Sequence, residues 1–171
     1  MAHPARVRMK KLLDAAEGFL ELELPQLALQ RLEKIESEGT LHTNGRYLKG
    51  EALRQLGRFE EAVEPLEKAA KSAPSNIHIW LALGWCYKRT NRLDAAIEAL
   101  QKALDAEPKE ALLLYNLACY YSLAGKRDAA LEHLAQALNI EPQYRDMMGT
   151  ETDFDPIRDD PEFQALASLL A

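Results

Sequence analysis

The chain is poor in the residues that would support most alternatives to a helical fold. Its 171 residues include two cysteines, eight glycines and eight prolines, and only 7% are aromatic. Two cysteines exclude a disulfide scaffold and fit a reducing compartment. A content of 47% apolar residues argues against disorder. The longest nearly apolar runs, 77–87 and 111–121, are shorter than the roughly 20 residues that a bilayer span needs, so they predict buried helices.

Basic residues are not in excess over the chain as a whole. The formal net charge is −6, from 21 Lys and Arg against 27 Asp and Glu, which does not favour binding to a polyanion. Most of the acidic excess lies in residues 145–171, which carry two arginines and seven acidic residues. The first eleven residues are basic, but four acidic residues within 14–23 exclude a secretory signal peptide. We expect a cytoplasmic protein without a membrane segment.

No arrangement of residues predicts catalysis or metal binding. The four histidines are scattered without an HExxH pattern, and the sequence has no glycine-rich phosphate loop and no nucleophile elbow. Cys86 and Cys119 are 33 residues apart and lack further ligands at the fixed spacing of a zinc site. We therefore expect no enzymatic activity, no cofactor and no bound metal.

The sequence repeats itself every 34 residues. Pro74, Pro108 and Pro142 are spaced at this distance and define the segments 43–76, 77–110 and 111–144. Four further columns match in the same register, namely Gly50, Gly84 and Ala118; Gly57, Asn91 and Gly125; Ala62, Ala96 and Ala130; and Ala69, Ala103 and Ala137. Chance would not align five columns in this way.

Each column has a physical reason in a chain of paired helices. Glycine or alanine allows two helices to pack closely where they cross, and the Gly57, Asn91 and Gly125 column has residue types that adopt the left-handed conformation closing a helix. The prolines cannot continue the second helix of each unit. Apolar residues at spacings of three and four predict amphipathic helices, and strand patterns are absent. Pro65 lies inside one predicted helix, where we expect a kink and not a break.

These columns resemble the tetratricopeptide repeat. The unit 77–110 carries the family pattern in Trp80, Leu83, Gly84, Tyr87, Ala96, Leu100, Ala103 and Pro108, and the unit 111–144 is similar. The unit 43–76 departs at Arg46, where a large apolar residue is usual, and a degenerate copy at 9–42 has Glu23 in place of the turn glycine. The resemblance implies an all-α fold for residues 1–144, a right-handed superhelical α-solenoid of antiparallel helix pairs.

Residues 145–171 do not follow the repeat and form an acidic C-terminal segment. Asp160, Pro161 and Glu162 are typical of a helix start. The apolar stripe of this helix comprises Phe163, Leu166, Leu169 and Leu170. The preceding stretch is similar to a segment that ends some bacterial repeat arrays. We favour a capping helix over the core of the last repeat, and an acidic recognition or self-inhibitory tail is the alternative.

The resemblance also implies where a ligand would bind. In the family, five positions on the first helix of each unit usually face a concave groove. These positions, together with a sixth-position asparagine, give the candidate groove residues Tyr47, Glu51, Arg54, His78, Leu81, Trp85, Lys88, Arg89, Tyr115, Asn116 and Cys119. They predict an aromatic floor (Tyr47, Trp85, Tyr115) and a basic patch (Arg54, Lys88, Arg89). Trp85 is surplus to the repeat pattern, so it is expected in the groove, unless it packs under the acidic tail or against a neighbouring helix.

These features predict a non-enzymatic interaction scaffold that binds a peptide or helix of a partner protein. The basic patch favours a partner segment with Asp or Glu beside apolar anchors. Two alternatives stay open. One is self-association into a homo-oligomer through the N-terminal unit or the tail, and the other is a small acidic chaperone for a secreted client. Nucleic-acid binding is disfavoured by the net charge and by the small size of the basic cluster.

Overall fold

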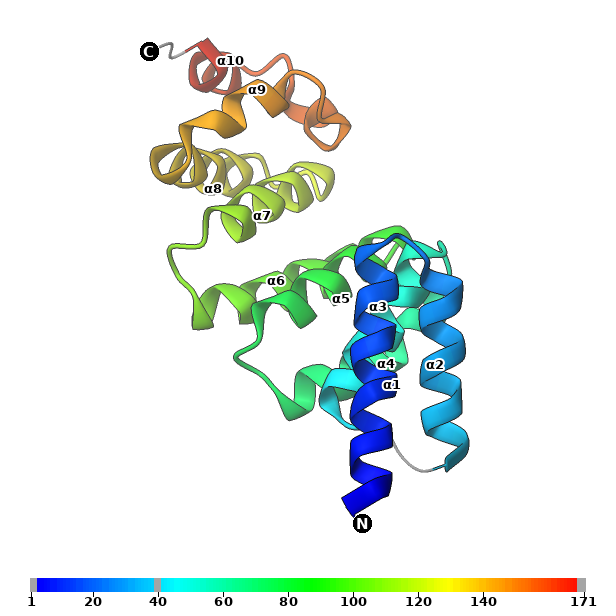
Figure 1. The fold of residues 1–171 in the computed structure, drawn as a ribbon. Coiled ribbons are helices and arrows are strands. Elements are labelled where there is room, and N and C mark those ends of the chain that lie inside the picture. Colours follow the sequence, from blue (N-terminus) through cyan, green and yellow to red (C-terminus); the bar gives the residue numbers. More distant parts are fainter. Residues whose placement is uncertain (1–2, 39–40, 169–171) are drawn as a thin grey trace. The chain divides into compact units, whose positions relative to one another are not determined.

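The computed structural model describes residues 3–38 and 41–168, with side chains described for 6–36 and 41–168. Within these ranges the chain forms helices and short turns and no strand, which confirms the predicted all-α class. The chain folds into two compact units, residues 1–91 and 92–171 (Figure 1).

The helices are consecutive and mostly of similar length. The first unit contains α1 (His3–Glu21), α2 (Pro25–Glu38), α3 (Thr43–Gln55), α4 (Phe59–Ser72) and α5 (Ile77–Arg89). The second unit contains α6 (Leu93–Ala106), α7 (Ala111–Leu123), α8 (Arg127–Ile140), the 3-10 helix η1 (Pro142–Tyr144), α9 (Arg145–Met148), the 3-10 helix η2 (Thr152–Ile157) and α10 (Pro161–Ser168).

The 34-residue period reappears in the helix boundaries. The helices α3, α5 and α7 begin at Thr43, Ile77 and Ala111, which are the first residues of the three sequence units. The helices α4, α6 and α8 begin 16 residues later in each 34-residue repeat. The sequence repeat is therefore a repeat of helix starts and turns.

The turns inside the helix pairs use the left-handed conformation that the sequence predicts. Gly57, Asn91 and Gly125 have φ angles of +74°, +58° and +69°. After Gly57, the Arg58 amide donates to the Leu53 carbonyl at 2.9 Å, as in a Schellman closure. Glu23 adopts a φ of +55° at the matching turn of the degenerate repeat 9–42. A side chain in this conformation costs about 1 kcal/mol, so this turn is less favourable than its glycine counterparts.

Alanine and glycine mark the closest helix contacts, as predicted. The alanines of the two sequence columns are completely buried: Ala62, Ala69, Ala96, Ala103, Ala130 and Ala137. At Gly50, a Cβ atom would lie only 2.4 Å from Cγ of the buried Leu66, which shows how closely α3 approaches α4. Helix α4 continues through Pro65, so the prediction that Pro65 does not end this helix is confirmed.

The C-terminal segment packs onto the last helix pair. Phe154 and Phe163 are buried, and their ring centroids are 5.3 Å apart. Helix α10 begins as predicted, because an Asp160 carboxylate oxygen accepts the Glu162 amide at 2.8 Å. Asp160 also accepts a bond from Nε of Arg127 in α8 at 2.6 Å. This helix therefore caps the array, whereas Leu169 and Leu170 of the predicted stripe lie outside the described residues.

The close contact at Gly50 predicts a measurable difference between two glycines. Gly50→Ala forces its new methyl group into Leu66, and such overpacking costs about 1–3 kcal/mol, which exceeds or offsets the roughly 1 kcal/mol gained in helix propensity. Gly18→Ala in α1 meets no atom within 4 Å and keeps that gain. Urea unfolding followed by circular dichroism should give a midpoint for Gly50→Ala at or below that of wild type, and a higher midpoint for Gly18→Ala. Equal midpoints for the two variants would contradict the packing described.

Candidate functional site

In the first unit, α3 carries three of the candidate groove residues on one face. Tyr47, Glu51 and Arg54 are separated by four and three residues, the spacing of neighbours along a helix surface. Helix α3 contacts both α1 and α5, so the first helices of three successive pairs lie side by side. We call the surface formed by Tyr47, Glu51, Arg54, Leu81, Trp85 and Lys88 the α3–α5 face.

The charge of Arg54 is compensated within α3. Its guanidinium donates to both carboxylate oxygens of Glu51, with Nε–Oε1 at 3.0 Å and Nη2–Oε2 at 2.9 Å. This hydrogen-bonded pair raises the pKa of Arg54 above its ordinary value. The Arg54 guanidinium therefore presents its charge together with that of Glu51, and not as an isolated cation.

Tyr47 lies near the Glu51–Arg54 pair and packs against the hydrophobic core of the first unit. Its ring packs against the buried cluster of the first unit, and burial is the main cause that raises the pKa of its phenol. The nearby carboxylates of Glu51 and of Glu17 in α1 raise this pKa further. Tyr47 thus offers a polar atom at the edge of the apolar packing.

Trp85 is the most prominent aromatic side chain on the α3–α5 face. It keeps 37% of its surface exposed, whereas Trp80 packs against the core and donates from Nε1 to the Pro74 carbonyl at 2.8 Å. Nζ of Lys88 lies 5.3 Å from the centroid of the Trp85 ring, a cation–π contact. The result is an exposed indole with a positive charge held against it.

Leu81 and His78 are the other two candidates on α5, and they contribute less to this face than Trp85 and Lys88. Leu81 is half-buried and lies one turn before Trp85. His78 is exposed in the first turn, where its backbone amide donates to Oδ1 of the capping Asn76 at 3.1 Å. His78 therefore contributes to the start of α5 through its main chain.

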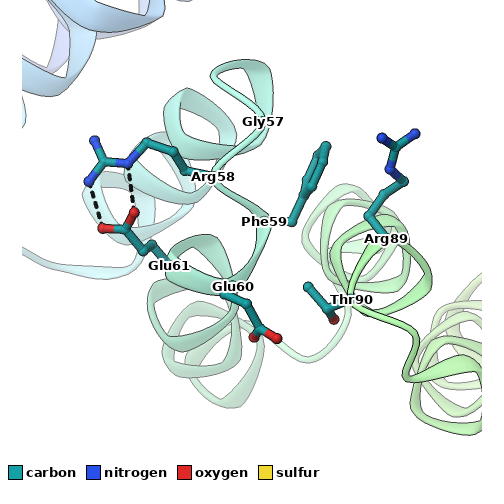
Figure 2. Close-up of a pocket in the computed structure, with 7 residues that line it drawn as sticks. All are labelled: Gly57, Arg58, Phe59, Glu60, Glu61, Arg89 and Thr90. Atoms are coloured by element: carbon teal, nitrogen blue, oxygen red, sulfur yellow. Dashed lines mark hydrogen bonds and ion pairs between the residues drawn. The ribbon is translucent and has the colours of Figure 1, made fainter.

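Arg89, the third residue of the predicted basic patch, packs against an aromatic ring of α4. Its guanidinium carbon lies 4.9 Å from the ring centroid of Phe59, at the turn between α3 and α4. Adjacent residues of a helix point about 100° apart, which separates Arg89 from Lys88. Figure 2 shows Arg89 at a cavity of about 490 Å³ lined also by Gly57, Arg58, Phe59, Glu60, Glu61 and Thr90.

The candidates on α7 are covered, which corrects the predicted aromatic floor. Tyr115 and Cys119 keep only 3% and 2% of their surfaces exposed. The Tyr115 ring stacks on Tyr144 at 4.7 Å between centroids and meets the edge of Phe154 at 5.5 Å. Asn116 is half-buried and donates to the Leu112 carbonyl at 2.8 Å. The C-terminal segment occupies the face of α7 that the sequence assigned to a ligand.

Two buried hydroxyl groups of α7 have no hydrogen bond in the described part of the chain. They belong to Tyr115 and to Ser122, which is fully buried. Burial raises the pKa of the Tyr115 phenol, and the carboxylates of Glu151 and Asp153 add to this effect. Phe154 was the sequence signal for this packing, because it is an aromatic residue placed directly between Asp153 and Asp155.

The described residues offer no metal centre and no membrane span. No group of three or more His, Cys, Asp or Glu side chains within them is placed to hold a metal ion. Every helix in the described ranges is too short or too polar to cross a bilayer. Cys86 and Cys119 are both buried and form no disulfide.

Sequence comparison matches two family models described as tetratricopeptide repeat. The first matches residues 13–77 and 47–111, and the second matches residues 111–144. No curated protein matches the chain.

Several solved structures are similar in fold. MamA from Desulfovibrio magneticus RS-1 is 24% identical with a TM-score of 0.74, over 79% of this chain and 76% of that chain. YrrB, described as a TPR protein with an unusual peptide-binding site, is 23% identical with a TM-score of 0.73, over 80% and 70%. MamA of AMB-1 is 19% identical with a TM-score of 0.75, over 96% and 92%. At these identities the likeness concerns the fold.

The covering of α7 predicts a difference in thiol reactivity. Phe154→Ala removes the ring that contacts Tyr115, so the segment over α7 should open more often and Cys119 should react several times faster with a thiol reagent. Cys86 is the internal control, because it is buried in the first unit. Mass spectrometry of the labelled peptides measures both rates in one sample. A Leu32→Ala variant, which weakens the core of the first unit, should leave the rate at Cys119 unchanged. Equal acceleration of both thiols would contradict local opening.

Proposed function

The chain belongs to the tetratricopeptide-repeat family, and on this premise we propose that it is a non-enzymatic protein–protein interaction module whose α3–α5 face binds a segment of a partner protein. The observation that carries the proposal is the exposure of Trp85 with Lys88 held over its ring. Tryptophan and arginine are over-represented among the residues that dominate binding energy at interfaces.

The chemistry of this face defines the partner segment. Trp85 and the half-buried Leu81 offer apolar contact, and Lys88 offers a positive charge beside it. The Glu51–Arg54 pair can exchange one of its hydrogen bonds for a carboxylate of the ligand while Tyr47 stays in place. The segment that fits best has an apolar anchor flanked by Asp or Glu.

The proposal includes the organisation and location of the chain. Residues 1–144 form the repeat array, and residues 145–171 form the acidic segment that caps it. Two buried cysteines that form no disulfide support a cytoplasmic location.

A peptide-display selection tests the proposal. Peptides selected on the wild-type protein should carry an apolar anchor with acidic neighbours. Trp85→Ala should weaken their binding by about 2 kcal/mol, close to thirtyfold, because it removes the central contact. Lys88→Ala should weaken it less. Fluorescence anisotropy of labelled peptides measures the affinities.

Arg89→Ala is the matched control, because Arg89 is the next cation on α5 but lies against Phe59. It should bind the peptides as wild type does. In parallel, affinity capture from a lysate of the native host should lose specific proteins in the Trp85→Ala/Arg54→Ala variant, with circular dichroism verifying its helix content. Peptides that bind Trp85→Ala and wild type equally would overturn the proposal.

A further inference from the structure

A second surface, in the C-terminal unit, has the character of a docking cleft. Helices α8 and α10 enclose a cleft of about 560 Å³. Its apolar lining comes from Leu131 and Ala135 on α8 and from Ala165 and Leu166 on α10. Ala135 and Ala165 are exposed and Leu166 is half-buried, so these three side chains are accessible from solvent, whereas Leu131 is buried beneath them. The cleft is separate from the α3–α5 face.

The charges around this cleft are predominantly negative. Asp128, Glu132 and Glu162 line it together with a single cation, Arg127. The Arg127 guanidinium is already engaged, with Nη1 at 2.7 Å from Asp128 and Nη2 at 3.1 Å from Glu162. It also pairs with Asp160 through Nε. An incoming segment therefore meets an apolar floor with an acidic rim.

The first turns of α1 carry the basic and apolar residues that would complement this acidic cleft. Helix α1 has 19 residues, whereas α3, α5 and α7 have 13 each, and the additional turns precede residue 9, where the degenerate repeat begins. Four basic residues fall within 6–11, and the first acidic residue is Asp14. Val7 is 43% exposed, and the exposed Lys10 and Lys11 share its helix face. This gives one apolar contact surrounded by positive charge.

We propose that the cleft between α8 and α10 binds the basic first turns of α1 from a second copy of this chain. Val7 contacts the apolar floor at Ala135, Ala165 and Leu166, and the basic residues face the acidic rim. A second copy is the occupant because one chain carries both complementary surfaces and therefore presents them to each other at equal concentration. The contact joins two different surfaces, so it is heterologous and each associated copy keeps one surface available.

The size and charge of the cleft determine how strongly two copies are expected to associate. A contact of one helix end with a short cleft buries less surface than the roughly 1,200 Å² of stable complexes, so the association is weak. Charge complementarity dominates, so salt should oppose it. Light scattering on wild-type protein should show a mass that rises with concentration up to about 1 mM and that falls as sodium chloride is increased.

Two variants separate the two surfaces. Arg6→Glu/Lys10→Glu reverses charge on α1, and Glu132→Lys/Ala135→Lys does so in the cleft without touching Arg127. Each should weaken self-association at least about tenfold, because like charges then face each other. The controls are Lys71→Glu/Lys109→Glu for α1 and Glu98→Lys for the cleft. Glu98 occupies on α6 the repeat position that Glu132 has on α8. Both controls should associate as wild type does.

Mixing the two variants gives the sharpest test. The α1 variant keeps a functional cleft and the cleft variant keeps a functional α1, so mixing them should restore the association that each variant alone has lost. A wild type that stays monomeric at every concentration overturns the proposal. Undiminished association of either variant alone, or a mixture of the two that stays monomeric, overturns it too. The substituted residues lie outside the α3–α5 face, so these outcomes do not bear on peptide binding there.

Discussion

Close contact between helices at alanine and glycine positions is the constraint on which the rest of the structure depends. Where α3 crosses α4, Gly50 lies so near Leu66 that even a methyl group would collide. The completely buried alanines mark a similar close contact between helices in each of the three 34-residue repeats. Because interiors pack at crystal-like density, such contacts set the register of each helix against its partner. That register decides which residues of α3 and α5 are left on the surface, and it leaves Trp85 among them.

Internal ion pairs reduce the number of cations available for recognition. Arg54 is paired with Glu51, Arg58 with Glu61, and Arg127 with Asp160. Pairs of this kind on a surface contribute little to stability, typically below about 1 kcal/mol. Their larger effect is on the potential that a ligand meets, because each guanidinium is presented with its own carboxylate. On the α3–α5 face, the binding that we propose therefore relies on the exposed surface of Trp85 and on Lys88 more than on Arg54.

The C-terminal segment covers one surface of the last helix pair and forms a new one. It covers the aromatic face of α7 by placing Tyr144 and Phe154 against Tyr115. The Tyr115 hydroxyl group under this covering is buried without a hydrogen bond in the described chain, which is unfavourable. Burial of Phe154 and Phe163 opposes this cost. The segment also creates the acidic cleft beside α8, so capping the array and forming a new surface are consequences of the same packing.

The repeat, the helix boundaries and the left-handed turns could all be predicted from the sequence, because they depend on local residue types at a fixed spacing. Trp80 in the core and the helix start at Asp160 follow from the same local rules. The candidate site was less predictable. Lys88 and Arg89 are adjacent in sequence, yet only Lys88 lies over Trp85, because the helix turns Arg89 toward Phe59. Tyr115 fits the groove pattern, but residues about 30 and 40 positions later cover it. Repeat positions describe how neighbouring units pack, whereas the exposure of a side chain depends on contacts with distant, non-repeating residues that only the tertiary structure brings together.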